Sequence, residues 1–218
     1  MSIILPQNQL IIDMKILIPT DYSETAKKAT DIGMQLAQKM GAEVLLFHSF
    51  SYPLMSSEDL SQTEQLAKQE QEDIEKEATL WKSIHQDLKV ETFSAYGSAV
   101  DHISAIVEEK GVDLIVMGTK GESNAMDTVF GSVCSHVINN VKCPTIVIPE
   151  KCNQLSLNEI VLASDFHKIE KLDTFDLFFE IAAKFDAHIA LLNVQHALNV
   201  HHGPNETEQW LDSLLEKY

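Results

Sequence analysis

The segment Val112–Gly121 constrains the fold more than any other part of this sequence. Its sequence is VDLIVMGTKG, and its apolar residues follow one another without alternation. Such a run is typical of a strand that is buried on both faces, as in a parallel sheet. Nine residues separate Gly121 from Gly131, and a new helical pattern begins at Ser132. A strand, a glycine-bearing loop and a helix N-terminus bring exposed N–H groups together, so we expect a bound phosphate here.

Strands and helices alternate through residues 14–149. Apolar runs predict strands at residues 15–18, 44–48, 90–95, 112–118 and 145–148. Between these strands, apolar residues at three- and four-residue steps predict helices that begin at Asp21 or Ser23, at Ser57, after Gly97 and at Ser132. This alternation predicts an α/β fold built on a doubly wound parallel sheet.

The first three predicted helices carry further signals. Glu24 is placed for a capping box against Asp21, and Gly41 and Gly111 are placed to end the first and third helices. The second helix, residues 57–86, is long and has an apolar residue at every seventh position. This stripe is too short and too sparse for a coiled coil, so we expect the helix to cover the sheet.

The beginning of the pattern occurs a second time. Residues 160–166 match 16–22 at an offset of 144, and residues 187–194 match 42–49 at an offset of 145. We therefore expect an N-terminal extension (1–13), a complete domain (14–149), a linker (150–158) and an incomplete second copy (159–218). Either the chain is a fragment of a longer tandem protein, or its second half has degenerated.

The charge of the chain argues against one class of partner. The net charge is −17, and all sixteen basic residues are lysines. A strongly acidic surface repels a phosphate backbone over most of its area. The absence of arginine also counts against nucleic-acid recognition and excludes an arginine finger supplied by the chain itself. We expect no nucleic-acid partner.

Cysteine usage and hydropathy indicate a cytoplasmic protein. The three cysteines, Cys134, Cys143 and Cys152, are odd in number, so we expect reduced, structural thiols rather than a disulfide framework. No apolar segment is long enough to span a membrane, and residues 1–12 lack the basic start of a secretory signal.

Four features together resemble the universal stress protein family. They are the strand ending in Pro19-Thr20-Asp21, the Met117-Gly118 turn, the spacing Gly118-x2-Gly121-x9-Gly131-Ser132, and the ending Cys143-Pro144-Thr145-Ile146-Val147-Ile148. The resemblance covers residues 15–150 in full and 159–218 in part. The glycine spacing is similar to that of the nucleotide-binding branch of the family, which implies an ATP site.

The resemblance also implies where ATP binds. In that family the strand order is 3-2-1-4-5, and ligands bind beyond the carboxyl ends of strands one and four, where the winding reverses. The nucleotide base would lie near Thr20, Asp21 and Ser49. The implied ATP-binding residues are Pro19, Thr20, Asp21, Ser49, Met117, Gly118, Lys120, Gly121, Gly131, Ser132 and Val133, the last three at the phosphates. Asp21 is suited to the ribose or base, or to a water bound to Mg²⁺.

Several of these residues also have a purely structural interpretation. Gly118 and Gly121 serve either a close approach to ATP or only the geometry of the turn. Asp21 and Ser132 are also candidate helix caps. Lys120 is placed equally well for contact with phosphate and for exposure to solvent.

The histidines point less clearly to chemistry. His48 ends a buried strand, and we expect it to be packed or bonded to backbone rather than catalytic. His196, His201 and His202, with Glu206, could hold a metal, but such a cluster in a polar loop is usually solvated. We expect no metal held by protein side chains.

These features lead to one function hypothesis and two alternatives. The resemblance implies an ATP-binding regulator or sensor in a stress response rather than an efficient enzyme. The case for catalysis is thin, because the sequence has no GxxxxGK[ST] motif and no arginine for efficient phosphoryl transfer. A non-nucleotide interaction module of the same fold and a slow ATP hydrolase remain open.

The incomplete repeat predicts how many ATP molecules one chain binds and how chains assemble. The second copy has Ala163-Ser164-Asp165 where the first has Pro19-Thr20-Asp21, and it lacks a glycine loop, so we expect one ATP site per chain. The strand 145–148 forms an apolar sheet edge, through which we expect a homodimer. Other regulatory protein partners are unidentified.

Overall fold

The structure, a computed structural model, describes residues 14–51, 60–120, 130–164 and 175–193. Within these ranges the chain forms two compact units, one ending at Leu155 and the other beginning at Ser156.

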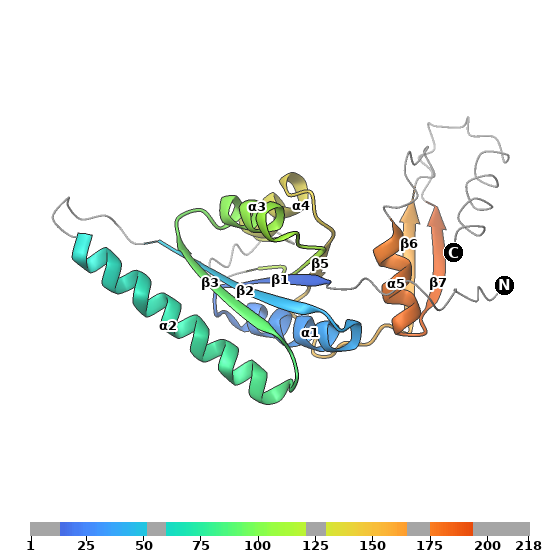
Figure 1. Cartoon of the computed structure of the whole chain (residues 1–218). Coiled ribbons are helices and arrows are strands. Elements are labelled where there is room, and N and C mark those ends of the chain that lie inside the picture. The colour runs from blue at the N-terminus through green and yellow to red at the C-terminus, as the bar shows by residue number, and fades with distance from the viewer. Residues whose placement is uncertain (1–13, 52–59, 121–129, 165–174, 194–218) are drawn as a thin grey trace, which may run out of the picture. The chain divides into compact units, whose positions relative to one another are not determined.

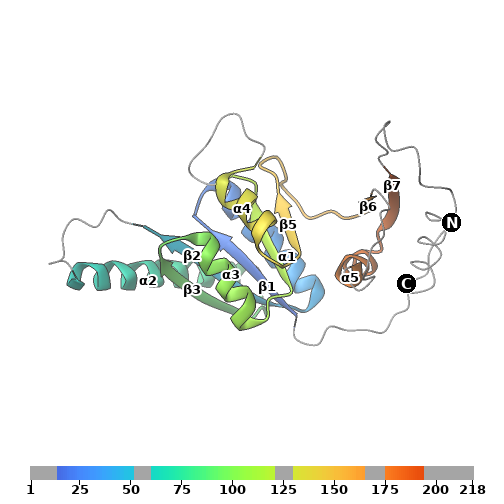
Figure 2. The same cartoon turned by 90° about the horizontal axis from the view of Figure 1, so that it is seen from above.

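The first unit is built on a five-stranded parallel sheet (Figures 1 and 2). Its strands are β1 (Lys15–Thr20), β2 (Glu43–Phe50), β3 (Val90–Tyr96), β4 (Leu114–Gly118) and β5 (Thr145–Ile148). Their order across the sheet is β3-β2-β1-β4-β5, and every pairing is parallel. The predicted fold class and strand order are confirmed.

Helices cover both faces of this sheet. They are α1 (Glu24–Met40), α2 (Leu60–Ile84), α3 (Ala99–Lys110) and α4 (Ser132–Asn140). α1 and α2 lie on one face, whereas α3 and α4 lie on the other (Figure 1). α2 contacts β2 and β3 through a face on which Ile74 and Ala78 are buried, so the expectation that it covers the sheet is confirmed.

The core explains why the strand sequences are continuously apolar. Ile16, Leu17 and Ile18 of β1 are each 0% exposed, although successive side chains of a strand point to opposite faces. Both faces are covered, so every position of the strand must be apolar. The cluster on the α3–α4 face contains Leu17, Leu45, Phe47, Ile103, Ile115, Met117, Cys134 and Val137.

The start of α1 differs from the prediction. Ser23 is the N-cap, and its Oγ accepts a hydrogen bond from the Ala26 N–H at 3.2 Å. Glu24 pairs with Lys27 at 2.9 Å, so the predicted capping box between Glu24 and Asp21 is wrong. The reason is local, because the Asp21 carboxylate accepts the Ser23 N–H at 3.1 Å and is committed to the turn before the cap.

Two of the helices end at a glycine in the left-handed backbone conformation. Gly41 follows α1 with a φ of 72°, and Gly111 follows α3 with a φ of 65°. Only glycine adopts this conformation without strain from a Cβ atom, so both predicted C-caps are confirmed.

The two edges of the sheet differ in how they are covered. At the β3 edge, Oε1 of Gln71 in α2 accepts the Ser94 N–H at 3.1 Å and the Ser94 hydroxyl at 2.9 Å. At the β5 edge, Ile146 and Val147 are half-buried, and no strand of the described residues pairs with the outer side of β5. An uncovered edge of this kind tends to pair with another strand.

The second unit contains β6 (Glu159–Ser164), α5 (Asp176–Lys184) and β7 (His188–Asn193), with β6 and β7 paired in parallel. Glu159 lies opposite His188, as Lys15 lies opposite Glu43 in the first unit. This is the register that the offsets of 144 and 145 residues predict. The interpretation as a second copy stays a prediction, and this register favours it.

One face of the β6–β7 sheet is better covered than the other. α5 lies against the sheet (Figure 1), and Leu162 of β6 and Phe179 of α5 are buried. Val161 of β6 and Leu192 of β7 are 53% and 48% exposed. The described part of this unit therefore has one apolar sheet face that is partly open.

Candidate functional site

A pocket of about 240 Å³ lies beyond the carboxyl ends of β1 and β4. In an open α/β sheet the winding reverses between two such strands, and ligands bind at this point. The residues that line the pocket and were expected from the sequence are Pro19, Thr20, Asp21, Ser49, Met117, Gly118, Lys120, Gly131, Ser132 and Val133. Gly121 lies outside the described residues, as do Glu122 and Asp127 of the same loop.

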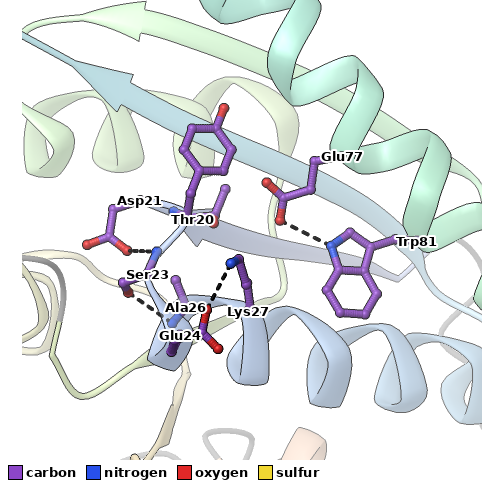
Figure 3. Close-up of polar contacts among 9 residues, drawn as sticks. Thr20, Asp21, Ser23, Glu24, Ala26, Lys27, Glu77 and Trp81 are labelled. Atoms are coloured by element: carbon purple, nitrogen blue, oxygen red, sulfur yellow. Dashed lines mark hydrogen bonds and ion pairs between the residues drawn. The ribbon is translucent and has the colours of Figure 1, made fainter.

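The end of β1 presents two polar side chains in a tight turn (Figure 3). The Tyr22 N–H donates to Thr20 Oγ1 at 3.1 Å, and the Ser23 N–H donates to Asp21 Oδ1 at 3.1 Å. Tyr22 has a φ of 62°, a conformation that is uncommon for a bulky side chain. These contacts hold Thr20 and Asp21 at the pocket wall before α1 begins.

Gly118 at the end of β4 is in close contact with the first turn of α1. A Cβ atom at Gly118 would lie 2.9 Å from Thr25 Cγ2 and 3.2 Å from the Thr25 carbonyl oxygen. Closely packed interiors do not accommodate such contacts without a shift of backbone. The close approach that the sequence indicated at Gly118 is therefore to α1, and its contact with a nucleotide stays a prediction.

Thr119 joins β4, β5 and the start of α4. Its N–H donates to the Ile148 carbonyl at 3.0 Å, and its own carbonyl accepts the Gly131 N–H at 2.6 Å. The second hydrogen bond brings the two ends of the loop 120–130 together. It places the N-terminus of α4 beside the end of β4, as the glycine spacing predicted.

The N-terminus of α4 has no side-chain cap. Gly131 is the N-cap residue, with a φ of −67° and no side-chain hydrogen bond to the helix, and Ser132 is the first helical residue. The alternative interpretation of Ser132 as the cap is therefore wrong. The first N–H groups of a helix have no partner within it, and the helix dipole makes this end positive. Together these properties suit an anion.

Five lining residues were not predicted as site residues. They are Ala26, Phe47, Ala99, Thr119 and Cys134. A signal was present for Phe47, which lies two positions before Ser49 and so shares its face of β2. Most of the missed residues are apolar, and they give the pocket a wall suited to a flat, weakly polar group.

Two of the three cysteines are poorly suited to nucleophilic chemistry. All three are free, as predicted. Burial raises the pKa of the Cys134 thiol at the pocket wall. Burial and the nearby Asp113 raise the pKa of Cys143 to about 11. Only the thiolate is an effective nucleophile, so both groups are inert near neutral pH.

Behind the pocket lies a group of ionisable side chains. His48 Nδ1 lies 2.8 Å from the Thr20 carbonyl oxygen, which confirms that His48 is bonded to backbone. Glu77 of α2 accepts a hydrogen bond from Trp81 Nε1 at 3.1 Å (Figure 3), and burial raises the pKa of its carboxyl group. Burial also raises the pKa of Tyr22, with the carboxylates Glu77, Glu70 and Asp73 acting in the same direction.

The described residues contain no group of three or more His, Cys, Asp or Glu that could hold a metal ion. The cluster of His196, His201, His202 and Glu206 lies outside those residues.

Within the described ranges, none of the helices is both long enough and apolar enough to cross a membrane.

Comparisons with known proteins agree with the fold of the first unit. Residues 14–149 match the sequence model of the universal stress protein family. Universal stress protein MJ0531 of Methanocaldococcus jannaschii is 31% identical over 144 residues, which are 62% of this chain and 81% of that protein. MJ0577 of the same organism is 28% identical over 159 residues, which are 63% of this chain and 95% of that protein. The solved structure of UspA from Lactobacillus plantarum superposes with a TM-score of 0.55 at 22% sequence identity. The match covers 62% of this chain and 97% of that one, and it shows that the two share a fold.

Proposed function

Because the chain belongs to the universal stress protein family, we propose that its first unit binds ATP at the carboxyl ends of β1 and β4. The observation that carries this proposal is the convergence of separate segments on one pocket. The end of β1, the end of β4 and the N-terminus of α4 line it together, as the sequence predicted. The proposed ligand goes beyond the family assignment and rests on the chemistry of the lining.

The lining suits the three parts of a nucleotide. The uncapped start of α4 offers N–H groups at Gly131, Ser132 and Val133 to the phosphates. Gly131 has no Cβ atom, so a phosphate can approach its backbone closely. Thr20, Asp21 and Ser49 supply oxygen atoms for the ribose or the base. The apolar wall residues that would pack against the base are Ala26, Phe47, Ala99 and Met117.

A cation would reach this site through the phosphates. Among the described residues that line the pocket, Asp21 supplies the carboxylate, and one of its oxygens already accepts the Ser23 N–H. We propose that Mg²⁺, when bound with ATP, contacts Asp21 through a water molecule, as is usual for this ion. Bound in this way, the ion would neutralise phosphate charge without a set of protein ligands.

The proposed role is that of a nucleotide-dependent regulator or sensor in the cytoplasm. The chain supplies no arginine to stabilise phosphoryl transfer, and the thiol at the pocket wall is protonated near neutral pH. Any hydrolysis of bound ATP would then be slow and incidental. A change in the bound nucleotide would act through the segments that contact it, which are the β1 turn and the start of α4.

We propose a homodimer that forms through the outer edge of β5. The outer side of β5 carries no strand of the described residues, and its side chains at Ile146 and Val147 are half-buried. Pairing with β5 of another chain would satisfy the outer backbone groups of this strand.

Calorimetric titration with ATP tests the nucleotide site. We expect binding in the wild-type chain and none for Gly131→Val, because a branched side chain would block the approach of phosphate to the α4 amides. Gly131 has a φ of −67°, so valine adds no strain of the left-handed kind. Asn139→Val places the same side chain at the exposed far end of α4 and is the matched control.

Two results would count against the proposal. One is normal ATP binding by a Gly131→Val variant that is folded by circular dichroism. The other is the absence of heat and of thermal shift for the wild-type chain at millimolar ATP, which would favour a non-nucleotide interaction module. Turnover above a few ATP per minute would favour an enzyme instead.

A further inference from the structure

Lys120 lies where the end of β4 meets the N-terminus of α4. It is half-buried and lines the pocket. The residue before it, Thr119, is 8% exposed and is held on two sides. Its N–H donates to the Ile148 carbonyl at 3.0 Å, and its carbonyl accepts the Gly131 N–H at 2.6 Å. The backbone that carries the Lys120 side chain is therefore fixed beside the first residue of the α4 cap.

Lys120 brings a positive charge to the pocket wall. Among the described residues that line the pocket, it is the basic one and Asp21 is the acidic one. None of the described carboxylates forms an ion pair with Lys120. The lysines that do form such pairs with carboxylates include Lys27, Lys68, Lys76 and Lys110. Within the described part of the chain, the charge of Lys120 is therefore not compensated by an acidic side chain.

The start of α4 alone suits a single phosphate group. Its N–H groups at Ser132 and Val133 have no partner within the helix, and the effect of the helix dipole is confined to the first turn. The rest of the chain opposes an anion, because its net charge is −17. A second or third phosphate group therefore needs a cation of its own. A lysine ammonium is a compact point charge that binds phosphate well.

We propose that Lys120 is a specificity-determining residue, through which the pocket selects nucleoside triphosphates over nucleoside monophosphates. This inference rests on the proposed function. A monophosphate has one group to place, and the α4 amides suffice for it. Only a chain of phosphates can contact these amides and the Lys120 ammonium at the same time. Specificity of this kind is a difference between two affinities, and Lys120 would act on one of them.

The size of the effect follows from the loss of one contact between charged groups. Lys120→Gln keeps a polar side chain but removes the positive charge. We expect this variant to bind ATP about tenfold more weakly, which is typical for one hydrogen bond to a charged group. Its affinity for AMP should change by less than about twofold. The preference for ATP over AMP should therefore fall by a similar tenfold factor.

Titration calorimetry of the full chain with ATP, ADP and AMP, at one fixed concentration of Mg²⁺, measures this preference. We expect the affinity of the wild-type chain to increase from AMP to ADP to ATP. A series at rising salt concentration adds a second measurement. An exposed charge contact is screened by salt, so the preference should weaken with salt in the wild-type chain more than in Lys120→Gln.

Two further variants separate a local contact from a general effect of charge. Lys120→Arg keeps the positive charge and should keep the preference for ATP. Lys142→Gln is the matched control, because it removes the same charge from an exposed position just beyond the C-terminal end of α4. This variant should bind ATP and AMP as the wild-type chain does.

The results distinguish failure of this inference from failure of the proposed function. The inference is overturned if Lys120→Gln weakens ATP and AMP by the same factor, as a merely structural role of Lys120 would. It is also overturned if Lys142→Gln reproduces the loss, if Lys120→Gln binds ATP normally, or if the wild-type chain prefers AMP. If no nucleotide binds to the wild-type chain, the proposed function fails, and this inference fails with it.

Discussion

Leu17 of β1 and Val161 of β6 occupy equivalent positions in two βαβ units, but Leu17 is 0% exposed and Val161 is 53% exposed. Phe47 of β2 and Leu192 of β7 differ in the same way, at 1% and 48%. The strand pairing is the same in the two units. The difference is on the second face of the sheet, which α3 and α4 cover in the first unit.

This comparison shows that a βαβ unit alone provides neither a closed core nor the proposed binding site. Its single helix covers one face of the sheet, and a parallel sheet needs cover on both faces. The pocket of the first unit lies between β1 and β4, so it also requires residues that come after the first βαβ unit. We therefore expect the first unit to be the more stable of the two and to bind ATP, and the second unit to be less stable and to bind none.

The largest expected difference between the units is in ATP binding. We expect calorimetry to give one site per chain, because Gly118, Gly131 and Ser132 of the first unit have no equivalent after residue 158. Removing residues 156–218 should then leave the affinity unchanged. Two equivalent sites, or loss of binding in the shortened chain, would show that the second unit contributes to a site.

The units should also differ in how often their strands open. We expect amide hydrogens of β6 and β7 to exchange at least about a hundredfold faster than those of β1 and β2. A two-stranded sheet with one open face has less buried apolar area to stabilise it. Hydrogen exchange followed by mass spectrometry on the intact chain measures this. Equal protection in the two sheets would mean that another segment or chain covers the second one.

Truncation of equivalent side chains should cost different amounts of stability. Leu17→Ala should lower the free energy of unfolding by about 3 kcal/mol, because it leaves a cavity in a closed core. Val161→Ala should lower it by less than about 1 kcal/mol, as is usual for exposed positions. Urea unfolding of the full chain compares the two variants. Similar losses would show that Val161 is buried in solution.

The smallest effect that we expect concerns assembly. Val147→Lys adds a charge to the β5 edge and should weaken the proposed dimer by about tenfold, since an edge lysine discourages pairing. Val161→Lys introduces the same residue on the open face of β6 and is the control. Light scattering over a range of concentrations measures both. A dimer weakened only by Val161→Lys would move the proposed interface to the second unit.

Sequence patterns predicted the first unit well because its elements are defined by local signals. Continuous apolar runs located the strands, and Gly41 and Gly111 located two helix ends. The start of α1 was less predictable because Asp21 and Ser23 are both good caps. Only the three-dimensional turn shows that Asp21 bonds to the Ser23 N–H. Competition between neighbouring polar residues is therefore resolved by geometry that the sequence does not show.

The sequence predicted the lining residues that lie at the ends of strands and helices. It predicted less well those that line the pocket through side-chain packing. Ten expected lining residues lie at strand or helix ends, where glycine and polar residues are informative. Ala26, Ala99 and Cys134 line the same pocket but resemble ordinary core residues in the sequence. The reason for Gly118 was also hidden, because Thr25, with which a Cβ would collide, belongs to a different element. Long-range contacts of this kind leave no local pattern.

The hydrogen bonds between Gln71 and Ser94 have a consequence for polymerisation. A sheet with two open edges can pair with two other sheets, and repeated pairing of such sheets gives an unlimited fibre. Here Gln71 of α2 occupies the Ser94 N–H at the β3 edge, which disfavours pairing there, whereas no strand of the described residues lies on the outer side of β5. Two molecules that join through β5 use up the available edge of each, and a two-fold axis closes the assembly. One glutamine thus disfavours continuation of the sheet beyond β3 and favours a closed pair over a fibre if chains join through β5.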